Sequence, residues 1–273
     1  MAKPPRLLVI AGSDSSGGAG LQADIKTAIA FGVYAMTAVT AVTAQDTTAV
    51  HAVRLMPPDL VRAQILACLN DIGADAIKIG MLGSAAIARA VADVLERDAR
   101  DIPLVLDPVL ASTSGKRFLD ARGIDVLRNR LFPLATLITP NLPEAETLTG
   151  LPASTSGQIV SAANRLRERG VRAALIKGGH SNSAMIEDTL VWDGGVETFA
   201  FPRIDARHTH GTGCTLATAI ACGLAEGLSL PLVVGRARAF VQTAIATAPG
   251  FGRGRGPLNH LHATRTSSVA GAT

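Results

Sequence analysis

The chain has 273 residues, of which 48% are hydrophobic, so it is long enough to bury the core of one large α/β domain. Its net charge is +4, the basic residues are scattered, and only 3% of residues are aromatic, which argues against a nucleic-acid-binding protein. The sequence has no run of about 18 apolar residues and no apolar leader, so neither a membrane span nor a signal peptide is expected.

The three cysteines, Cys68, Cys214 and Cys222, include no CxxC pair. A sparse, odd set favours a reducing compartment over a disulfide framework or a zinc site, so we expect a cytoplasmic protein. Cys68 and Cys222 fall on apolar helical faces and are predicted to be core residues.

The chain begins with a predicted strand, a glycine-rich turn and a helix. Leu7–Ile10 is an apolar run typical of a buried strand, and residues 11–20 contain four glycines and three serines. The turn lacks the GxGxxG dinucleotide fingerprint, so it predicts either close backbone approach to a small ligand or ordinary turn chemistry. The following helix has an apolar face formed by Leu21, Ile25, Ala28 and Ile29.

Strands alternate with helical patterns along the rest of the chain. Helices are expected from Pro57, from Gly213 and after Pro231. Such alternation predicts a mostly parallel sheet covered by helices on both faces. Lys78, inside a predicted strand, is either snorkelling or paired. The predicted strands are 37–45, 76–81, 102–106, 134–138 and 173–176, followed by a hairpin over 190–201 that turns at 193–195.

Polar residues follow several of these strands directly. Gln45, Asp107, Glu144 and the Lys177-Gly-Gly-His180 segment all lie at or just beyond a strand's carboxyl end. Ligands of parallel α/β sheets bind at that edge, so we expect these side chains to converge there.

Residues 208–215 combine two glycines around Thr212 with the predicted start of a helix at Gly213. Free amide groups and the positive end of the helix dipole make such a turn suited to a phosphate. The alternative is an ordinary glycine-containing helix start.

Together these residues could perform phosphoryl transfer. Asp107 and Glu144 could hold Mg²⁺ largely through water, and Lys177, one of only five lysines beside 21 arginines, could bind phosphate. No Walker A sequence occurs. Each residue has a plainer alternative: Asp107-Pro108 as a turn, Glu144 as a helix cap, and Lys177 as one half of an ion pair.

The chain resembles the hydroxymethylpyrimidine and phosphomethylpyrimidine kinases of thiamine biosynthesis, members of the ribokinase-like superfamily. The resemblance covers residues 7 to about 262. It is carried by AGSDSSGGAGLQADIKT at 11–27, TAVTAQDT at 40–47, KIGML at 78–82, LDPV at 106–109, ITPNLPEAE at 138–146, KGGH at 177–180, THGTGCT at 209–215 and GRGPLNH at 254–260.

The resemblance implies a ribokinase-like three-layer α/β/α sandwich with a mostly parallel central sheet and a small β lid or hairpin. It implies one domain over residues 1–262, with a disordered tail expected at 263–273. The implied activity is ATP-dependent phosphorylation of 4-amino-5-hydroxymethyl-2-methylpyrimidine and then of its monophosphate. The implied ligands are ATP, Mg²⁺ and the pyrimidine, and a role for a monovalent cation is left open. No nucleic-acid or membrane partner is expected, whereas a homodimer is, with residues 33–55 forming a lid or interface.

The resemblance also assigns site residues. It places Gly12, Gln45, Met81 and Val109 in the pyrimidine pocket, Asp107 and Glu144 at the magnesium, and Lys177, Thr209, Gly211 and Gly213 at the nucleotide phosphates. It assigns catalysis to Cys214, Gly211, Thr212, Gly213 and Lys177, with residues 211–214 as the anion hole.

Cys214 stands where related sugar kinases have a catalytic aspartate. A thiol at a helix N-terminus is expected to have a lowered pKa, so we hypothesise that Cys214 accepts or orients the proton of the substrate hydroxyl. The alternative is a small packing residue. Asp46 and His208 depart from the asparagines usual in the family, and His208 could alter nucleotide contacts.

Two rival functions remain at this stage. A pyridoxal kinase of the same superfamily shares the anion hole and can share the cysteine, although Gln45 favours the pyrimidine. A non-catalytic pyrimidine-binding module is disfavoured because Asp107, Glu144, Lys177 and the glycine turn are all present. A dinucleotide oxidoreductase is disfavoured by the missing fingerprint.

Overall fold

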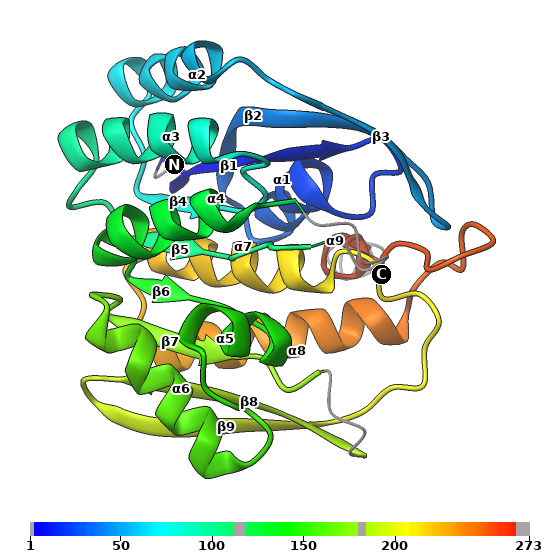
Figure 1. Ribbon diagram of the computed structural model, residues 1–273. Helices are drawn as coiled ribbons and strands as arrows, with labels where there is room; N and C mark the ends of the chain where they lie inside the picture. The colour runs from blue at the N-terminus through cyan, green and yellow to red at the C-terminus, as the bar shows by residue number, and fades with distance from the viewer. Residues whose placement is uncertain (1–2, 112–117, 180–183, 266–273) are drawn as a thin grey trace.

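The computed structural model describes residues 3–111, 118–179 and 184–265 (Figure 1). Within them, nine strands form one sheet in the order β3-β2-β1-β4-β5-β6-β7-β8-β9. The sheet is parallel from β2 to β7, while β3, β8 and β9 pair antiparallel at its edges. The strands are β1 (Arg6–Asp14), β2 (Tyr34–Gln45), β3 (Val50–Leu55), β4 (Ala76–Ile79), β5 (Leu104–Leu106), β6 (Leu137–Ile138), β7 (Ala173–Ile176), β8 (Met185–Trp192) and β9 (Gly195–Pro202).

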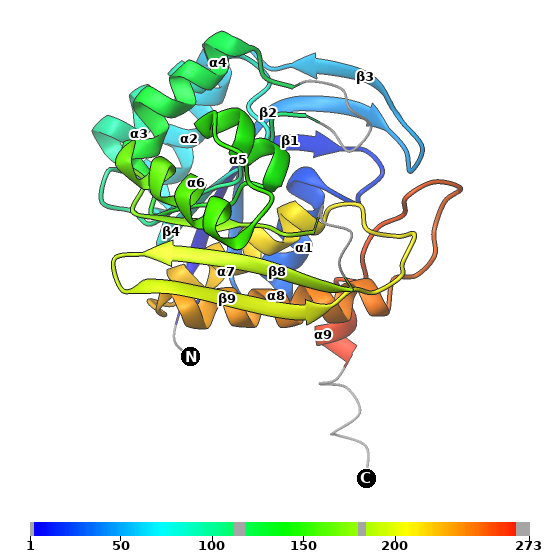
Figure 2. The same ribbon diagram turned by 60° about the horizontal axis from the view of Figure 1, so that its bottom comes forward.

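Helices cover both faces of the sheet (Figure 2), so the expected three-layer α/β/α fold is confirmed. One face is covered by α2 (Pro58–Asp71), α3 (Ala85–Asp98), α4 (Ala121–Val126), α5 (Leu142–Thr149) and α6 (Ser156–Glu168). The other is covered by α1 (Gly20–Ala30), α7 (Thr212–Ala225) and α8 (Leu230–Ala246). The remaining helical segments are η1 (Leu127–Leu131), η2 (Phe132–Leu134) and α9 (His262–Arg265).

The apolar strand sequences explain this layering. Successive side chains of a strand point to opposite faces, so a strand covered on both sides must be apolar at every position. In β1, Leu8 and Ile10 pack into the core beneath α2–α6, while Leu7 and Val9 pack into the core beneath α1, α7 and α8. All four side chains are fully buried.

Most predicted elements are confirmed, and the differences have local reasons. The strand β1 runs on to Asp14, so the first part of the expected loop at 11–20 is extended backbone. Leu134 belongs to the short helix η2, and only Leu137–Ile138 pair as a strand. The edge strand β3 was not predicted, although four of its six residues, Val50, Ala52, Val53 and Leu55, are apolar. Cys222 is buried as expected, but Cys68 is only partly buried.

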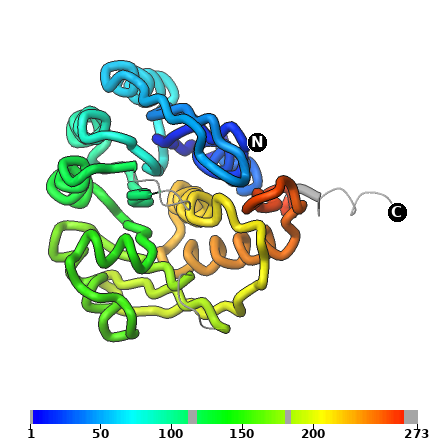
Figure 3. Tube along the Cα trace, turned by 45° about the vertical axis from the view of Figure 1, so that its right-hand side comes forward, coloured from blue at the N-terminus to red at the C-terminus, as the bar shows by residue number. Residues whose placement is uncertain are grey.

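The C-terminal segment returns to the start of the chain. The amide of Arg255 donates to the carbonyl of Thr47 at 2.8 Å, which places residues 254–256 beside the end of β2 (Figure 3). Of the expected tail at 263–273, residues up to 265 belong to α9, and 266–273 lie outside the described residues, as does His180. Every helix in the described part of the chain is too short or too polar to cross a membrane.

Lys78 is paired and fully buried. Its Nζ atom lies 3.1 and 2.9 Å from the two carboxylate oxygens of Asp24 on α1, and Thr218 on α7 donates to the same carboxylate at 2.6 Å. Both charged side chains have no exposed surface. Burial disfavours the ammonium ion, but Asp24 outweighs this effect and raises the pKa of Lys78. The pair therefore ties β4, α1 and α7 together beneath the carboxyl edge of the sheet.

Lys78→Met leaves Asp24 buried without a counter-charge, so we expect it to lower the free energy of unfolding by about 3–5 kcal/mol. The double variant Asp24→Asn/Lys78→Met removes both charges and should recover part of that loss. Urea denaturation at neutral pH measures both effects. A Lys78→Met protein as stable as the wild type would contradict this account of the pair.

Candidate active site

One cleft of about 1420 Å³ opens at the carboxyl edge of the sheet. Parallel strands end there, and the loops that follow them converge. The cleft brings together every site residue predicted from the sequence: Gly12, Gln45, Met81, Asp107, Val109, Glu144, Lys177, Thr209, Gly211, Thr212, Gly213 and Cys214.

The start of α7 forms one wall of this cleft. Gly211 precedes the helix with φ of 87°, in the left-handed region. A Cβ atom on Gly211 would lie 1.8 Å from the carbonyl oxygen of Gly18, so only glycine lets this turn touch the loop after β1. Gly211 has no side chain to cap this end of α7, and in the first turn the amide of Thr212 donates to the carbonyl of Thr209 at 3.3 Å, so the amides that follow it keep hydrogen-bonding capacity for a ligand.

Lys177 and Asp107 lie beside this helix start. Lys177 Nζ donates to Asp107 Oδ1 at 3.0 Å, and Thr139 donates to the same oxygen at 3.1 Å. A Cβ atom on Gly213 would lie 3.4 Å from Lys177 Nζ and 3.7 Å from Asp107 Oδ2. The ion pair that was the plainer alternative for Lys177 is thus present, and it lies beside the first turn of α7.

Glu144 caps a helix, which was the plainer alternative considered for it. Its side chain accepts from the amide of Asn141, and its own amide donates to the Asn141 side chain, both at 2.9 Å, which forms a capping box at the start of α5. Burial, with a contribution from the nearby Asp107 charge, raises the pKa of Glu144 to about 7, although Lys177 opposes the shift. The same negative groups outweigh burial at Lys177 and raise the pKa of its ammonium group.

The donor set fits a hard divalent cation. Among the described residues, no group of three or more His, Cys, Asp and Glu side chains could enclose a metal by itself. Asp107 and Glu144 instead offer two carboxylates in an open cleft, where burial, with a contribution from the Asp107 charge, raises the pKa of Glu144 to about 7. Magnesium is commonly held by one or two carboxylates, water and substrate phosphates, which matches this arrangement.

Cys214 corrects one expectation. Burial raises the pKa of its thiol to about 11, and the nearby Lys78 charge only partly opposes this. The expected lowering by the helix N-terminus is therefore wrong for the ligand-free protein. At neutral pH, Cys214 is a neutral thiol on the wall of the cleft.

The predicted pyrimidine-pocket residues lie at the ends of β1, β2 and β4 and just after β5. A Cβ atom on Gly12 would lie 2.4 Å from Met81 Cε, so glycine is what lets Met81 cover the end of β1. The Gln45 amide faces His210 Nε2 at 3.1 Å, and that ring nitrogen lies 2.8 Å from Asp14 Oδ2. Asp14, His210 and Asp24 had no role assigned from sequence, whereas pairing was one of the two alternatives for Lys78. The only signal was that Asp14 and His210 lie inside the two glycine motifs.

His208 and Asp46, the two residues that depart from the family pattern, both form hydrogen bonds in the structure. His208 Nδ1 accepts from the amide of Gly256 at 3.0 Å. Asp46 accepts from the amides of Thr48 and Ala49 and contacts His51 Nε2 at 2.9 Å. Hydrogen bonds from Thr48 lower the pKa of Asp46. Both residues thus organise loops beside the cleft, and an effect of His208 on nucleotide contacts stays a prediction.

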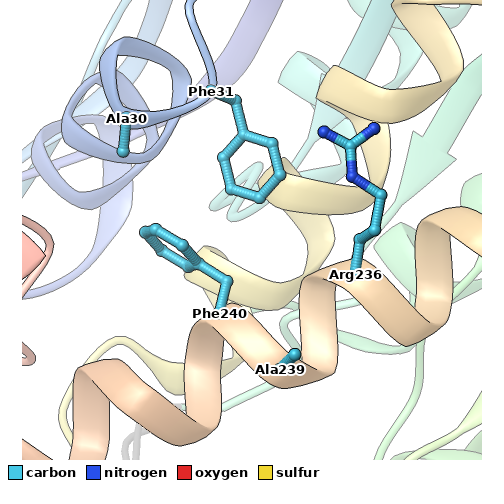
Figure 4. Close-up of a pocket in the computed structure, with 5 residues that line it drawn as sticks. All are labelled: Ala30, Phe31, Arg236, Ala239 and Phe240. Carbon is cyan, nitrogen blue, oxygen red and sulfur yellow. The ribbon is translucent and has the colours of Figure 1, made fainter. Parts of the chain in front are cut away.

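A second, smaller hollow of about 390 Å³ lies between α1 and α8. Figure 4 shows the Arg236 guanidinium and the Phe31 and Phe240 rings around it. The two rings lie 5.0 Å apart between centroids, and Arg236 lies 5.7 Å from the Phe31 centroid. None of the predicted site residues lines this hollow.

Comparison with known proteins agrees with the geometry. The sequence profile of a family described as phosphomethylpyrimidine kinase matches residues 14–259. The chain belongs to this family. The hydroxymethylpyrimidine/phosphomethylpyrimidine kinase of Streptomyces coelicolor is 45% identical over 258 residues, which cover 94% of each chain.

Two solved structures of kinases share the fold. An ADP complex of Bacillus subtilis pyridoxal kinase superposes with a TM-score of 0.88 at 34% identity, covering 97% of this chain and 100% of that one. A phosphomethylpyrimidine kinase from Clostridium difficile gives a TM-score of 0.79 at 36% identity, covering 89% and 100%. The ribokinase-like fold expected from the sequence is confirmed.

The raised pKa of Glu144 predicts a pH-dependent stability. A carboxyl whose pKa is higher in the folded state binds its proton more tightly there, so folding loses free energy as pH rises from about 4.5 to about 7. The stability of the wild type relative to Glu144→Gln should therefore fall between about pH 5 and pH 7 and then level off. Urea denaturation without nucleotide or divalent ions measures the difference. Glutamine at this position can keep the capping box, and a difference that rises with pH would contradict the prediction.

Proposed function

We propose that this protein is an ATP-dependent kinase that phosphorylates 4-amino-5-hydroxymethyl-2-methylpyrimidine and then its monophosphate to the diphosphate, in thiamine diphosphate biosynthesis. The observation that carries the proposal is the meeting of Lys177, Asp107 and the start of α7 in one cleft that also holds Gln45. Membership of the phosphomethylpyrimidine kinase family supports the same chemistry.

The phosphate end of the cleft would bind ATP. Phosphoryl transfer proceeds through a loose transition state whose negative charge must be stabilised by nearby cations and hydrogen-bond donors. Lys177 supplies the cation, with Thr209, Gly211 and Gly213 alongside, and the amides of residues 211–214 form the anion hole. Asp107 and Glu144 would hold Mg²⁺, largely through water, and the ion supplies charge neutralisation at the phosphate oxygens.

The substrate end would hold the pyrimidine among Gly12, Gln45, Met81 and Val109. Cys214 lies between the two ends and would orient the substrate hydroxyl. Because the transition state is loose, the hydroxyl proton leaves late, so a neutral thiol is sufficient for this orienting role.

Several finer statements belong to the same proposal. We infer a single kinase domain over residues 1–262, a cytoplasmic location and a homodimer in which residues 33–55 contribute a lid or interface. A monovalent cation beside the phosphate site is a further hypothesis. The antiparallel β2–β3 pair, with Val42 and Leu55 exposed, supports the lid or interface.

Pyridoxal phosphorylation is the second candidate function. The 0.88 TM-score to Bacillus subtilis pyridoxal kinase favours it, because fold and anion hole would serve either substrate. Gln45 favours the pyrimidine, since a carboxamide can donate and accept at once to an aminopyrimidine edge.

Release of ADP distinguishes the functions. The enzyme is given Mg²⁺ and ATP with the hydroxymethylpyrimidine, its monophosphate or pyridoxal in separate reactions. We expect turnover on both pyrimidines and weak turnover on pyridoxal. Turnover on pyridoxal alone would show that the protein is a pyridoxal kinase. Binding of the pyrimidine without ADP release in any of the three reactions would indicate a non-catalytic binding protein.

Cys214→Ala tests the role of the thiol. If Cys214 orients the hydroxyl, we expect kcat to fall by about 10- to 100-fold while the KM for ATP stays within about twofold. Cys214→Ser keeps a hydrogen-bonding group and should retain more activity than Cys214→Ala. An alanine variant with full turnover would reduce Cys214 to a packing residue.

A further inference from the structure

Three side chains from distant parts of the chain meet at the substrate end of the cleft. His210 Nε2 lies 2.8 Å from Asp14 Oδ2 and 3.1 Å from the terminal amide of Gln45. The side chains of His210 and Asp14 are only 14% and 4% exposed. All three residues line the cleft, and neither Asp14 nor His210 has a role in the proposed mechanism.

Asp14 acts only as an acceptor. Its Oδ1 accepts from the amide and the hydroxyl of Ser16 at 2.9 and 2.8 Å, and its Oδ2 accepts from the amide of Ala19 at 2.8 Å. Burial opposes ionisation, but hydrogen bonds from His210 and Ser16 outweigh it and lower the pKa of Asp14. His210 Nε2 must therefore carry a hydrogen and donate it to the carboxylate, whether the ring is neutral or charged.

This donor decides how the Gln45 amide is oriented. As the carboxamide is assigned, Gln45 Nε2 lies 3.1 Å from His210 Nε2, so two donors face each other. A half-turn of the carboxamide places Oε1 at nearly the same position, where it can share the single Nε2 hydrogen with Asp14 Oδ2 in a bifurcated hydrogen bond.

The hydrogen bonding of Thr43, on the other side of the Gln45 amide, favours the same orientation of the carboxamide. Its single hydroxyl hydrogen is donated to the carbonyl of Ser13 at 2.9 Å, so toward Gln45 the oxygen can only accept. The amide atom assigned on that side is Oε1, 3.5 Å from Thr43 Oγ1, and the same half-turn of the carboxamide would replace it by the NH₂ group, from which the hydroxyl can accept. Both hydrogen-bond counts thus favour the half-turned carboxamide, with the Gln45 oxygen toward His210 and its nitrogen toward Thr43.

The His210 ring is held where it can enforce this orientation. A Cβ atom on Gly18 would lie 2.5 Å from His210 Cδ2, so the bare backbone of Gly18 packs against the ring. The His210 amide donates to the carbonyl of Gly256 at 3.1 Å. The imidazole is therefore fixed by the loop after β1 and by the C-terminal segment together.

We propose that His210, held by Asp14, is a positioning residue that fixes the Gln45 carboxamide so that the pocket selects an amino-substituted over an oxo-substituted pyrimidine edge. With one bond to His210 and one toward Thr43, Gln45 keeps one oxygen lone pair and one N–H for a ligand. An aminopyrimidine edge offers an exocyclic N–H donor beside a ring-nitrogen acceptor, which this pair matches. This inference rests on the proposed function, because the proposed function makes Gln45 the residue that hydrogen-bonds to the pyrimidine.

An oxo-substituted analogue presents the opposite pattern. Its carbonyl oxygen accepts where the amino group donated, and its ring N–H donates where the bare nitrogen accepted. With the carboxamide fixed, the Gln45 oxygen would face the carbonyl oxygen of the analogue, and the Gln45 N–H would face its ring N–H. Neither pair can form a hydrogen bond, and burying unpaired polar groups lowers the binding free energy gained. A freely turning carboxamide could serve both substrates, so loss of His210 should relax the discrimination.

The test measures kcat/KM for the 4-amino substrate and for its 4-oxo analogue, both carrying the hydroxymethyl group. We expect the wild type to prefer the amino compound by at least about 100-fold, and His210→Leu to reduce that ratio by about tenfold, mainly through the KM for the pyrimidine. His210→Gln is the matched control, because its side-chain NH₂ can donate to both Asp14 and Gln45 and should keep the ratio within about threefold of the wild type.

A second measurement does not depend on any variant folding. Nitrogen-15 NMR of the labelled wild-type protein reports which ring nitrogen of His210 carries hydrogen, and the proposal requires hydrogen on Nε2. A bare Nε2, or a His210→Leu enzyme with wild-type discrimination, overturns the inference while the kinase function stands. A wild-type enzyme that phosphorylates neither pyrimidine overturns the proposed function itself, and the inference with it.

Discussion

The loop after β1 lies directly against the turn that begins α7, and the cleft depends on this backbone contact. Gly211 leaves no space for a side chain, since a Cβ atom there would overlap the carbonyl oxygen of Gly18. The contact places the free amides of α7, which suit a phosphate, next to the loop that holds Asp14 and His210 near Gln45. Substrate and phosphate ends are thus fixed relative to each other by backbone.

At the phosphate end, one positive side chain, Lys177, faces two carboxyl groups, Asp107 and Glu144. Lys177 contacts Asp107, and burial, with a contribution from the Asp107 charge, raises the pKa of Glu144 to about 7 against the opposing effect of Lys177. Such a cluster is poorly balanced without a further cation, which is why it suits a magnesium nucleotide. Beneath it, the buried Lys78–Asp24 pair joins β4 to α1. The structure therefore separates a charge pair that supports the fold from a charge pair that is open to ligand.

Sequence reasoning located the site because parallel strands end at one edge, so polar residues after successive strands had to converge. The strand 173–176, an apolar run followed by Lys177, was predicted in full. The pKa of Cys214 was predicted in the wrong direction, because the helix end was weighed but burial was not. The role of His210 could not be found from sequence, since it depends on Asp14, 196 positions earlier in the chain.

The central claim is that a phosphoryl group is transferred at the first turn of α7, beside the Lys177–Asp107 pair. Gly213→Ala tests it most directly, because the added methyl group would stand 3.4 Å from Lys177 Nζ and φ at this position is not in the left-handed region. The measurement is the single-turnover rate of phosphoryl transfer, with thermal unfolding as the control for the fold. The account predicts a rate lower by at least about 100-fold in a protein that still folds. An unchanged rate would place the transferred group elsewhere and contradict the account.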